Sequence, residues 1–556
     1  MSNKKRLINV AVLALSQSAF AQTPPPAGGQ IQQIPPPPMR DRAAPEIRIE
    51  PTTAPVAPAA DEARIVVNSL RVTGQTVYSE SDLIAITGFT AGKELSLSEL
   101  RSMAAKIAEY YRSNGYFVTQ AYLPPQDIKD GAVTISVIEG RYGTIGLRNE
   151  SNLSDGLARG VLDGLNSGDP ITIAPLENRL LLLSDIPGVN VRSTLAPGVE
   201  VGTSDLIVDV APGRRVTGSV EADNAGNRYT GEYRAGATVN INNPTGHGDV
   251  LSFRALTSGS GLKYGRASYQ AQVGKATLGV AYTALEYRLG REFAPLNAHG
   301  TVEIASLYGS YPLIRSRNTN LYLLGGFDEK TFQDKVDLTS TVTDKKAHVA
   351  WVGLHGNHLD RIGGGGASSY SLTQSFGNLD IETPAALAAD AATARSNGQY
   401  QKLAYQVARL QRVTDRLSLY GAINGQVASK NLDISEKMGL GGPYAVRAYP
   451  VGEGYSDEGY IANLEARYLL PKFSDAIPGQ MHLVGFADTA TGTTHRQPWT
   501  SGPNRRTLSG AGFGVTWVDY NNFAMSAYWA HKLGNAVAQS VPDTNSRVWV
   551  QLVKFF

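Results

Sequence analysis

Residues 439–470 read GLGGPYAVRAYPVGEGYSDEGYIANLEARYLL, a loop-like half followed by a strand-like half. Glycine and proline punctuate the first half, which is typical of a long loop. The second half alternates over about residues 460–468, which predicts a strand with one apolar and one charged face. The charged face holds Ile461, Asn463, Glu465 and Arg467. Arg447 stands alone among small residues of the loop, and we interpret this as a loop folded into a polar interior.

The alternation with a period of two extends from residue 214 to the end of the chain. Segments of about ten residues carry polar side chains at alternate positions and apolar ones between them, the pattern of a transmembrane barrel. A soluble sandwich also alternates, but so many strands in one series over 343 residues favour a barrel. Sixteen strands are predicted, an even number as closure usually requires. They begin near residues 214, 229, 249, 263, 276, 302, 319, 345, 367, 399, 416, 459, 480, 508, 523 and 546.

Residues 1–21 have the three parts of a secretory signal peptide. The basic run KKR at 4–6 is followed by an apolar run at 7–15 and by the small-residue pattern AFA at 19–21. A short buried helix is the alternative interpretation. No run of about eighteen apolar residues follows, so we expect no membrane-spanning helix. An exported chain of this kind is periplasmic, secreted or a β-barrel.

Residues 22–63 are rich in proline and are expected to form an extended linker. Eleven of these 42 residues are proline, including all four of 35–38. Proline removes a backbone donor and blocks helix interiors, so this segment cannot build a core of its own. The longest run without proline, 27–34, has room for about two helical turns at most.

Residues 64–213 predict two small α+β units, at 64–140 and 141–213. In the first unit, Ser96 and Glu99 match a capping box that opens a helix. Strands are expected there at 65–72, 116–123 and 132–139, and the helix is expected to end at Asn114 and Gly115. The second unit is expected to have strands at 142–148, 189–196 and 205–211 and helices near 153–161 and 175–184. The repeat alone is compatible with any pair of small α+β domains.

Several motifs resemble the two-partner secretion transporters, which form the haemolysin secretion/activation protein family. A motif similar to the family's VRGY/F, with alanine in place of the usual glycine, is formed by Val446, Arg447, Ala448 and Tyr449. Phe486 and Asp488 match the F-x-D motif of barrel strand thirteen. The tandem units resemble POTRA domains, and LLLLSDIPGV at 180–189 resembles the second of them.

The resemblance implies an α+β part, POTRA domains at 64–140 and 141–213, followed by an all-β 16-stranded antiparallel transmembrane barrel at 214–556. It also implies that the sixth outer loop, 430–458, folds inward and that its Arg447 pairs with Asp488. The period of two places Asp488 on the same face as Phe486, which we expect to line the lumen. The alternative is that lumen water solvates both charges, and such a pair contributes little.

The resemblance also bears on both ends of the chain. Related transporters often begin with a helix that plugs the barrel, and the short run at 27–34 leaves open whether this chain has one. Phe556, at the end of an alternating strand, resembles the signal that the barrel assembly machinery reads. It is alternatively an aromatic belt residue of the closing strand.

Composition and motifs argue against several classes of function. The net charge of +2 gives no indication of nucleic-acid binding, and the absence of cysteine excludes disulfides and thiolate metal sites. Phosphate-loop, serine-hydrolase and zinc-protease motifs do not occur. His355 and His358 lie near Asp360, but on a strand they face opposite ways. We therefore expect no metal site, no cofactor and no enzymatic activity.

These features together predict an outer-membrane translocator of a Gram-negative bacterium, with residues 64–213 in the periplasm. Its expected partners are one secreted exoprotein of the adhesin or haemolysin type, bound through the POTRA domains, as well as outer-membrane lipid and the barrel assembly machinery. An assembly insertase of the same superfamily is the alternative, although more than two POTRA units would be typical of one. A passive porin would lack residues 64–213.

Overall fold

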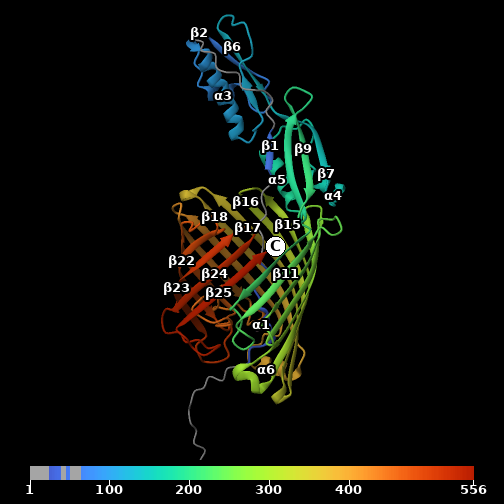
Figure 1. Ribbon diagram of the computed structural model, residues 1–556, viewed down its shortest axis with the longest axis vertical. Coiled ribbons are helices and arrows are strands. Elements are labelled where there is room, and N and C mark those ends of the chain that lie inside the picture. The colour runs from blue at the N-terminus through green and yellow to red at the C-terminus, as the bar shows by residue number, and fades with distance from the viewer. Residues whose placement is uncertain (1–23, 39–45, 50–63) are drawn as a thin grey trace, which may run out of the picture.

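The computed structural model describes residues 24–38, 46–49 and 64–556. Two small α+β units stand one beyond the other at one end of a large β-barrel (Figure 1). The predicted signal peptide, residues 1–21, lies outside the described residues. Among the helices of the described ranges, none is long and apolar enough to cross a membrane.

The distal unit, residues 64–140, is built around one long helix packed against two small sheets. The Glu99 N–H donates to the Ser96 hydroxyl and the Ser96 N–H donates to the Glu99 carboxylate, so the predicted capping box opens α3. The sheets have the orders β3-β6-β5 and β2-β4. The elements are β2 (Arg64–Val67), β3 (Ser69–Thr73), α2 (Glu80–Thr87), β4 (Lys93–Ser96), α3 (Leu97–Ser113), β5 (Gln120–Tyr122) and β6 (Ala132–Ile138).

The distal unit differs from the prediction in its strands. The stretch predicted as one strand at 65–72 is divided between β2 and β3. The N–H groups of Asn68 and Ser69 both donate to the Gly131 carbonyl, at 2.8 and 3.3 Å, and this turns the chain from one sheet into the other. The strand predicted at 116–123 is shorter, because only β5 pairs with β6. Helix α2 and strand β4 have no counterpart in the prediction.

The proximal unit, residues 141–213, lies between the distal unit and the barrel (Figure 1). Its sheet has the order β1-β8-β9-β7, and the leucine-rich helix α5 buries Leu176, Leu180 and Leu183 against it. The unit contains β7 (Arg141–Asn149), α4 (Asp155–Leu162), α5 (Ile173–Ser184), β8 (Val189–Pro197) and β9 (Thr203–Pro212). The added strand, β1 (Glu46–Ile49), comes from upstream of both units and runs parallel to β8.

The prediction of an extended linker over residues 22–63 is wrong at two places. One is β1, and the other is the short helix α1 (Ala27–Ile31), which follows Pro26 and lies inside the barrel. Both elements depend on contacts with residues far away in the chain, such as the bond from the Ala27 N–H to Asp334, at 2.7 Å. Local composition does not report such contacts, and the packing overrides the weak helix propensity of this proline-rich segment.

The barrel consists of sixteen antiparallel strands, so the predicted number is confirmed. It closes where β10 pairs with β25. The second strand begins later than predicted, at 234 instead of near 229. The strands are β10 (Val216–Asp223), β11 (Arg234–Asn242), β12 (Val250–Thr257), β13 (Leu262–Val273), β14 (Ala276–Arg288), β15 (Ala298–Arg315), β16 (Thr319–Val336), β17 (Thr341–Asp360), β18 (Gly366–Ile381), β19 (Gly398–Arg412), β20 (Leu417–Ala428), β21 (Glu458–Leu469), β22 (Gln480–Thr493), β23 (Arg505–Asp519), β24 (Phe523–Lys532) and β25 (Ser546–Phe555). A sixth helix, α6 (Pro384–Ala392), lies in the loop between β18 and β19.

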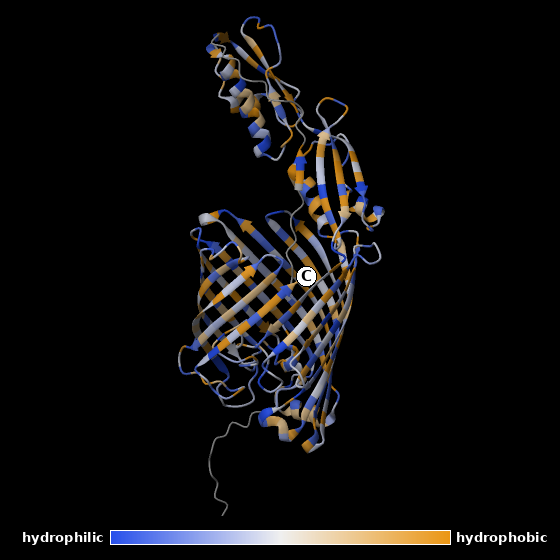
Figure 2. Cartoon of the chain, in the orientation of Figure 1, coloured by the Kyte–Doolittle hydropathy of each residue, from blue (hydrophilic) through white to orange (hydrophobic). Residues whose placement is uncertain are grey.

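The alternating pattern has the predicted orientation. On β20 the apolar side chains of Leu419, Ile423 and Val427 are 48%, 50% and 48% exposed on the outside of the barrel. On β11 the polar side chains of Arg234 and Thr238 are buried on the inside. Figure 2 shows apolar and polar residues interleaved along the barrel strands. An apolar outer surface around a polar lumen is what a barrel in lipid requires.

Polar contacts attach the proximal unit to the mouth of the barrel. Arg315, at the end of β15, donates to both carboxylate oxygens of Asp185 at 2.6 and 2.8 Å. Such two-point contacts fix orientation as well as distance. Arg317 pairs with Glu177 of α5 at 2.6 Å, and Asn178 donates to the Arg315 carbonyl at 2.9 Å. The proximal unit is therefore held against the opening of the lumen.

Candidate functional site

The loop between β20 and β21, residues 429–457, folds back into the barrel. Leu440, Val446, Ala448 and Tyr449 have no exposed surface, although no strand of the barrel contains them. The two arms of the loop are joined by a bridge between Met438 and Ser456. This buried hairpin-like fold is the setting of the Arg447 side chain.

The guanidinium of Arg447 lies between two carboxylates of the lumen wall. It donates from Nε to Asp488 Oδ2 and from Nη2 to Asp488 Oδ1, both at 2.8 Å. Its Nη1 donates to Glu465 Oε1 at 2.8 Å, and its backbone N–H donates to Asp488 Oδ2 at 3.1 Å. Bidentate Arg–carboxylate pairs of this kind are among the strongest hydrogen-bonded contacts in proteins. The alternative interpretation, in which lumen water solvates Arg447 and Asp488 separately, is therefore wrong.

Aromatic rings complete the surroundings of Arg447. The centre of its guanidinium is 3.5 Å from the centroid of the Phe486 ring, close enough for a cation–π contact. The Tyr528 ring lies 5.2 Å away. The Trp549 indole N–H donates to the Arg447 carbonyl at 2.7 Å. The side chain of Arg447 is only 5% exposed, so these contacts operate in a largely desolvated place, where they are stronger than at a surface.

The register of two wall strands places both carboxylates under the loop. Asn463 of β21 is directly opposite Asp488 of β22, and Glu465 is opposite Phe486. Residues two apart on a strand share a face, so all four side chains point inward. Asn463 donates to Asp488 Oδ1 at 2.8 Å, and Arg467 donates to Glu465 Oε2 at 2.8 Å. Two positive and two negative side chains thus balance within the cluster.

The alanine at position 448 is accommodated by a glycine on the wall. A Cβ placed on Gly510 of β23 would come within 2.5 Å of the Ala448 Cβ. A real Cβ pair cannot approach so closely, so the Ala448 methyl occupies the space that a side chain at 510 would need. The loop therefore packs directly against the backbone of Gly510, which has no side chain.

The beginning of the loop is tied to a different part of the wall. Asp433 pairs with Lys345 of β17 at 2.7 Å. Glu436 pairs with Lys330 of β16 and with Lys402 of β19, both at 2.7 Å. The Asp433 and Glu436 side chains are nearly fully buried, so they depend on these lysines for charge compensation.

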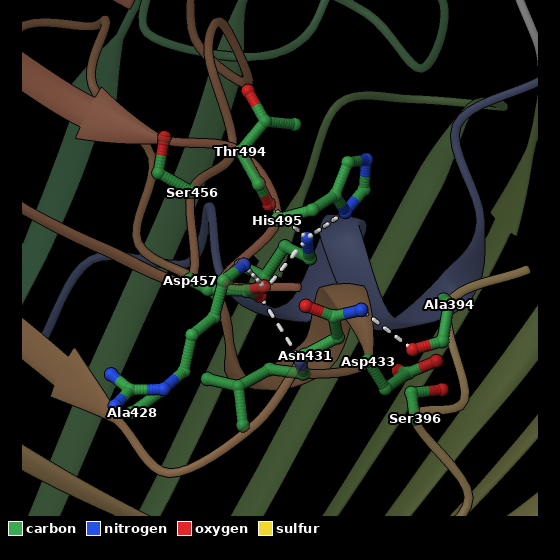
Figure 3. A network of polar contacts seen from close by, with 12 residues as sticks. Ala394, Ser396, Ala428, Asn431, Asp433, Ser456, Asp457, Thr494 and His495 are labelled. Carbon is green, nitrogen blue, oxygen red and sulfur yellow. Dashed lines mark hydrogen bonds and ion pairs between the residues drawn. The ribbon is translucent and has the colours of Figure 1, made fainter. Parts of the chain in front are cut away.

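The two ends of the loop meet in a polar network near the outer rim (Figure 3). Asp457 accepts from the Leu432 N–H at 3.0 Å and pairs with Lys437 at 3.0 Å. Lys437 donates to the Thr494 carbonyl at 2.6 Å and to His495 Nδ1 at 3.3 Å. Burial, helped by the positive charge of Lys437, lowers the pKa of His495 to about 4. His495 is therefore neutral near pH 7, as its role as acceptor requires.

The loop also contacts its neighbour between β24 and β25. Glu453 is completely buried and accepts from the Ser540 N–H and hydroxyl at 2.9 and 2.6 Å. It also forms an ion pair with Arg506 of β23. The Tyr449 hydroxyl donates to the Ala536 carbonyl at 2.8 Å. The inward loop is thus joined to the outer end of the barrel as well as to its wall.

Residues 24–38, which include α1, occupy the lumen beside the loop, and we call them the plug segment. The Tyr455 hydroxyl of the loop donates to the Gly29 carbonyl at 2.9 Å. Gln33 donates to the same hydroxyl at 3.0 Å. A Cβ on Gly28 would meet Ser435 Cβ at 2.8 Å, so α1 packs directly on the loop. Helix α1 therefore lies in the lumen, which is the position expected of a plug helix.

The plug segment meets the opposite wall through its backbone. Arg234 donates to the Gln33 carbonyl at 3.0 Å, and Arg254 donates to the Pro35 carbonyl at 2.6 Å. Each arginine also pairs with a carboxylate on β10, Arg234 with Asp223 and Arg254 with Glu221. The sequence of the plug segment, PPPAGGQIQQIPPPP, has no charged residue. The charges of Arg234 and Arg254 are therefore compensated by carboxylates of the wall and not by the plug segment.

Two large cavities lie in the lumen between described residues. One of about 950 Å³ lies between the plug segment, the loop and the wall. The other, of about 2170 Å³, opens toward the proximal unit. The lining of the second includes uncharged polar side chains of the wall, namely Thr217, Ser219, Thr238, Asn240, Ser252, Ser268, Gln270, Asn320 and Asn357. Arg214, Arg315, Arg317 and several aliphatic residues line it as well.

Several residues singled out from the sequence come together in one place. The structure joins Arg447 with Phe486 and Asp488 and buries Val446, Ala448 and Tyr449 around them. Phe556 lies apart, where its N–H donates to the Gly218 carbonyl of β10 at 3.1 Å and extends the pairing that closes the barrel. Among the described residues no group of three His, Asp or Glu side chains could hold a metal ion.

Sequence reasoning missed five members of the cluster: Asn463, Glu465, Arg467, Tyr528 and Trp549. Asn463 and Glu465 were on the predicted charged face of 460–468, but no local signal identified them as partners of Arg447. Trp549 is 102 positions from Arg447, and no local signal in the sequence pointed to it.

Comparisons with known proteins identify the family. A model described as haemolysin secretion/activation protein ShlB/FhaC/HecB matches residues 202–517, and one described as POTRA domain, ShlB-type, matches residues 65–140. The heme/hemopexin transporter protein HuxB of Haemophilus influenzae is 31% identical over 474 residues, 84% of this chain and 82% of the relative. The outer membrane transporter CdiB of Dickeya dadantii is 23% identical over 391 residues, 68% of each chain.

Solved structures agree on the fold. CdiB from Escherichia coli matches with a TM-score of 0.66 and 20% identity, covering 91% of this chain and 93% of that one. BamA from Haemophilus ducreyi, lacking POTRA domains 1–3, matches with a TM-score of 0.56 and 14% identity, covering 88% and 100%. At these identities the likeness concerns the fold alone.

The fold and the buried loop define an outer-membrane β-barrel translocator with its N-terminal POTRA domain in the periplasm. More narrowly, the chain belongs to the haemolysin secretion/activation protein family, the transporters of two-partner secretion. Its function is therefore to translocate a protein partner across the outer membrane.

Proposed function

We propose that residues 64–213 capture the unfolded exoprotein in the periplasm and deliver it to the lumen. The position of the proximal unit over the large cavity is the observation that carries this proposal. The layout of the proximal unit and the segment at 180–189 support its being a second POTRA domain. Exposed sheet edges of such units suit an extended chain, because main-chain hydrogen bonds do not depend on its sequence.

The lining of the large cavity supports passage of an extended polypeptide. Its hydroxyl and amide side chains can exchange hydrogen bonds with a moving backbone without holding any one side chain strongly. We propose that folding outside the cell draws the chain through, since the nucleotide-binding motifs sought above do not occur in the sequence.

We propose that the plug segment closes the resting lumen and leaves it during export. The loop 429–457 would narrow the lumen and support the plug segment while staying on the wall. Buried ion pairs on strands β16, β17, β19, β21 and β22 support a stationary loop. The plug segment carries no charged residue, and the two arginines that donate to its carbonyls have carboxylate partners of their own, which supports its removal.

We propose that Phe556 serves the barrel assembly machinery, which would recognise β25 before closure. Its place next to Gly218 of β10 supports this, because the last residue then completes the seam. For the cargo we propose only a secreted protein. The heme/hemopexin activity in the printed name of one relative is a statement about that relative.

Secretion in cells tests the proposal directly. The partner should be released by cells that make the full chain and retained by cells whose protein lacks residues 64–213. The shortened protein must still shift its gel mobility on heating, which shows that the barrel folded. Continued export by the shortened protein would contradict capture by residues 64–213.

The insertase alternative makes a different prediction. Cells without the protein should lose export of one partner and keep normal amounts of their other outer-membrane barrels. A general fall in outer-membrane barrels would favour an insertase.

A further inference from the structure

Strand β1 covers an edge of the proximal sheet with the chain's own backbone. Without it, β8 would be the edge of the order β8-β9-β7. The two strands are parallel, with Ile47 opposite Ser193 and Ile49 opposite Leu195. An uncovered edge strand presents unpaired N–H and C=O groups and is a template for pairing with another extended chain.

Within the part of the chain that the structure describes, strand β1 fills this place only in part. It has four residues, whereas β8 has nine. Ile47 is partly buried against the core of the proximal unit, but Ile49 is 51% exposed. Ser193 and Leu195 of β8 are buried, so the two isoleucines lie on the side of the sheet that packs on the core of the proximal unit. The exposure of Ile49 shows that this side is incompletely covered at the edge.

The same edge adjoins the entrance to the lumen. Asn190, Val191 and Arg192 of β8 line the cavity of about 2170 Å³. Ser219 and Thr238 of the barrel wall line it from the other side. A segment on this edge of β8 would therefore already stand at the barrel mouth.

We propose that the edge of β8 on which β1 lies is a docking edge for an extended segment of the exported chain. In the resting protein β1 occupies this edge, and the incoming segment displaces it. The proposal rests on the export function above and adds the site, the direction and the resident strand. The incoming segment runs parallel to β8 and carries aliphatic residues two positions apart, as Ile47 and Ile49 do, because alternate side chains face the same side. Unfolded chains offer such segments and folded ones bury them.

Displacement of β1 also bears on the plug segment. Pro38 lines the same cavity, and seven residues separate it from Glu46. A chain spans at most about 3.5 Å per residue, so β1 keeps Pro38 within about 28 Å of the proximal sheet. Once β1 leaves the sheet, residues 46–49 no longer hold Pro38 close to the proximal unit. The next described residue along the chain is Arg64. Docking of cargo thus gives the plug segment more freedom to leave.

A disulfide tests the proposal in a chain that has no cysteine of its own. Arg48 and Thr194 are Cα partners, and neighbouring strands lie within the Cα separation that a disulfide spans. Arg48→Cys with Thr194→Cys locks β1 onto β8 when oxidised, and dithiothreitol releases it. The matched control, Val66→Cys with Glu94→Cys, locks β2 onto β4 in the distal unit.

Export of the partner is expected to stop in the oxidised β1-locked protein and to return on reduction. The control should export equally in both states. Equal export by the oxidised and reduced forms of the β1-locked protein would overturn the proposal while leaving the export function intact. A wild-type protein that exports nothing would instead contradict the export function.

A binding measurement examines the edge without export. The probe is a labelled peptide of residues 43–52, AAPEIRIEPT, and the target is the full chain in vesicles. Ile47→Asp in the protein removes the side chain that holds β1, so the peptide should bind this variant at least about tenfold more tightly than wild type. The oxidised β1-locked protein should not bind, nor should a peptide with both isoleucines changed to Asp bind any form. Equal binding to locked and released protein would overturn the proposal.

Discussion

The lumen contains two pieces of the chain, the loop 429–457 and the plug segment 24–38, which are held in different ways. The loop carries charged side chains that reach carboxylates or lysines on several strands. The plug segment has no charged residue and is held by its carbonyls, one backbone N–H and its glutamines. Removing one partner of a buried ion pair costs about 3–5 kcal/mol. A hydrogen bond in which one partner is charged, as in the contacts of Arg234 and Arg254 with the plug segment, contributes about 1.5–3 kcal/mol.

The difference indicates which piece moves. If the plug segment leaves, Arg234 and Arg254 keep their carboxylates and the wall stays electrically balanced. If the loop leaves, Asp488 loses its cation in a largely dry place. Moving the plug segment, which has no charged residue, opens the lumen without breaking the ion pairs of the wall.

The largest effect is expected from Arg447→Ala. This change leaves Asp488 unpaired and removes Glu465's contact with the loop, which should destabilise the inward position of the loop by ~3 kcal/mol or more. Export should fall to a small fraction of wild type. No strand-to-strand hydrogen bond is lost, so the amount of barrel in the outer membrane should not change. The measurement is secreted partner per folded barrel.

Three companion variants sharpen this result. Arg467→Ala removes a cation that pairs with Glu465 without touching the loop, so it should export nearly normally. Arg447→Lys should restore export only in part, because lysine lacks the planar fork. Arg447→Ala with Asp488→Ala should be no worse than the single Arg447→Ala change. Fully additive losses would contradict the pairing.

A second effect is expected from a methyl group on the plug segment. In Gly28→Ala the new Cβ would lie 2.8 Å from Ser435 Cβ and 3.0 Å from its backbone N, so α1 must shift. Overpacking of this kind costs about 1–3 kcal/mol. Single-channel conductance should rise while the loop stays protected from protease. Gly29→Ala is the matched control, because its Cβ would lie 3.3 Å from the terminal methyl of Ile434 and 3.5 Å from the Tyr455 hydroxyl, which requires a smaller adjustment. Identical conductance of the Gly28→Ala and Gly29→Ala proteins would contradict the close packing of α1 on Ser435 as what keeps the lumen closed.

A comparable effect on the loop is expected from Gly510→Ala. The added methyl collides with Ala448, which should loosen the loop by about 1–3 kcal/mol and lower export. Ala448→Gly in the same protein removes the colliding methyl and should restore export. Failure of this rescue would show that Gly510 matters for a reason other than the contact with Ala448.

The smallest effect is expected from pH. The folded loop holds His495 with a pKa of about 4, below its ordinary value of ~6.5. When the loop is released, His495 takes up a proton that it does not bind while the loop is anchored. Anchoring is therefore complete above about pH 6.5 and weakens as the pH falls toward 4. Protease cleavage of the loop should be faster at pH 5 than at pH 7.5. His495→Asn should reduce this difference, and an unchanged difference would assign it to other groups.

The sequence was sufficient for the elements that depend on local periodicity. The period of two identified all sixteen strands, and the family motif placed Arg447 and Asp488 together. Glu465 was visible as a charged residue on the right face. Its role depends on the register between β21 and β22, which no local pattern determines.

The plug segment and β1 illustrate the opposite case. The plug segment is rich in glycine and proline and has poor helix propensity, and β1 has only four residues. The structure of both comes from partners such as Asp334 and Ser193, well over a hundred positions away. From the proline content we expect that the region builds no core of its own. The proline content could not show that the region enters two other cores.

Thiol accessibility during export tests most directly whether the plug segment moves while the loop stays. Ala27 and Val446 have no exposed surface, and the chain has no cysteine to interfere. Proteins with Ala27→Cys or Val446→Cys are treated with a membrane-impermeant maleimide, at rest and with a partner stalled in transit. We expect the cysteine at 27 to become reactive on stalling and the cysteine at 446 to stay protected. A cysteine at 446 that becomes equally reactive, or one at 27 that stays protected while the partner is in transit, would contradict the account.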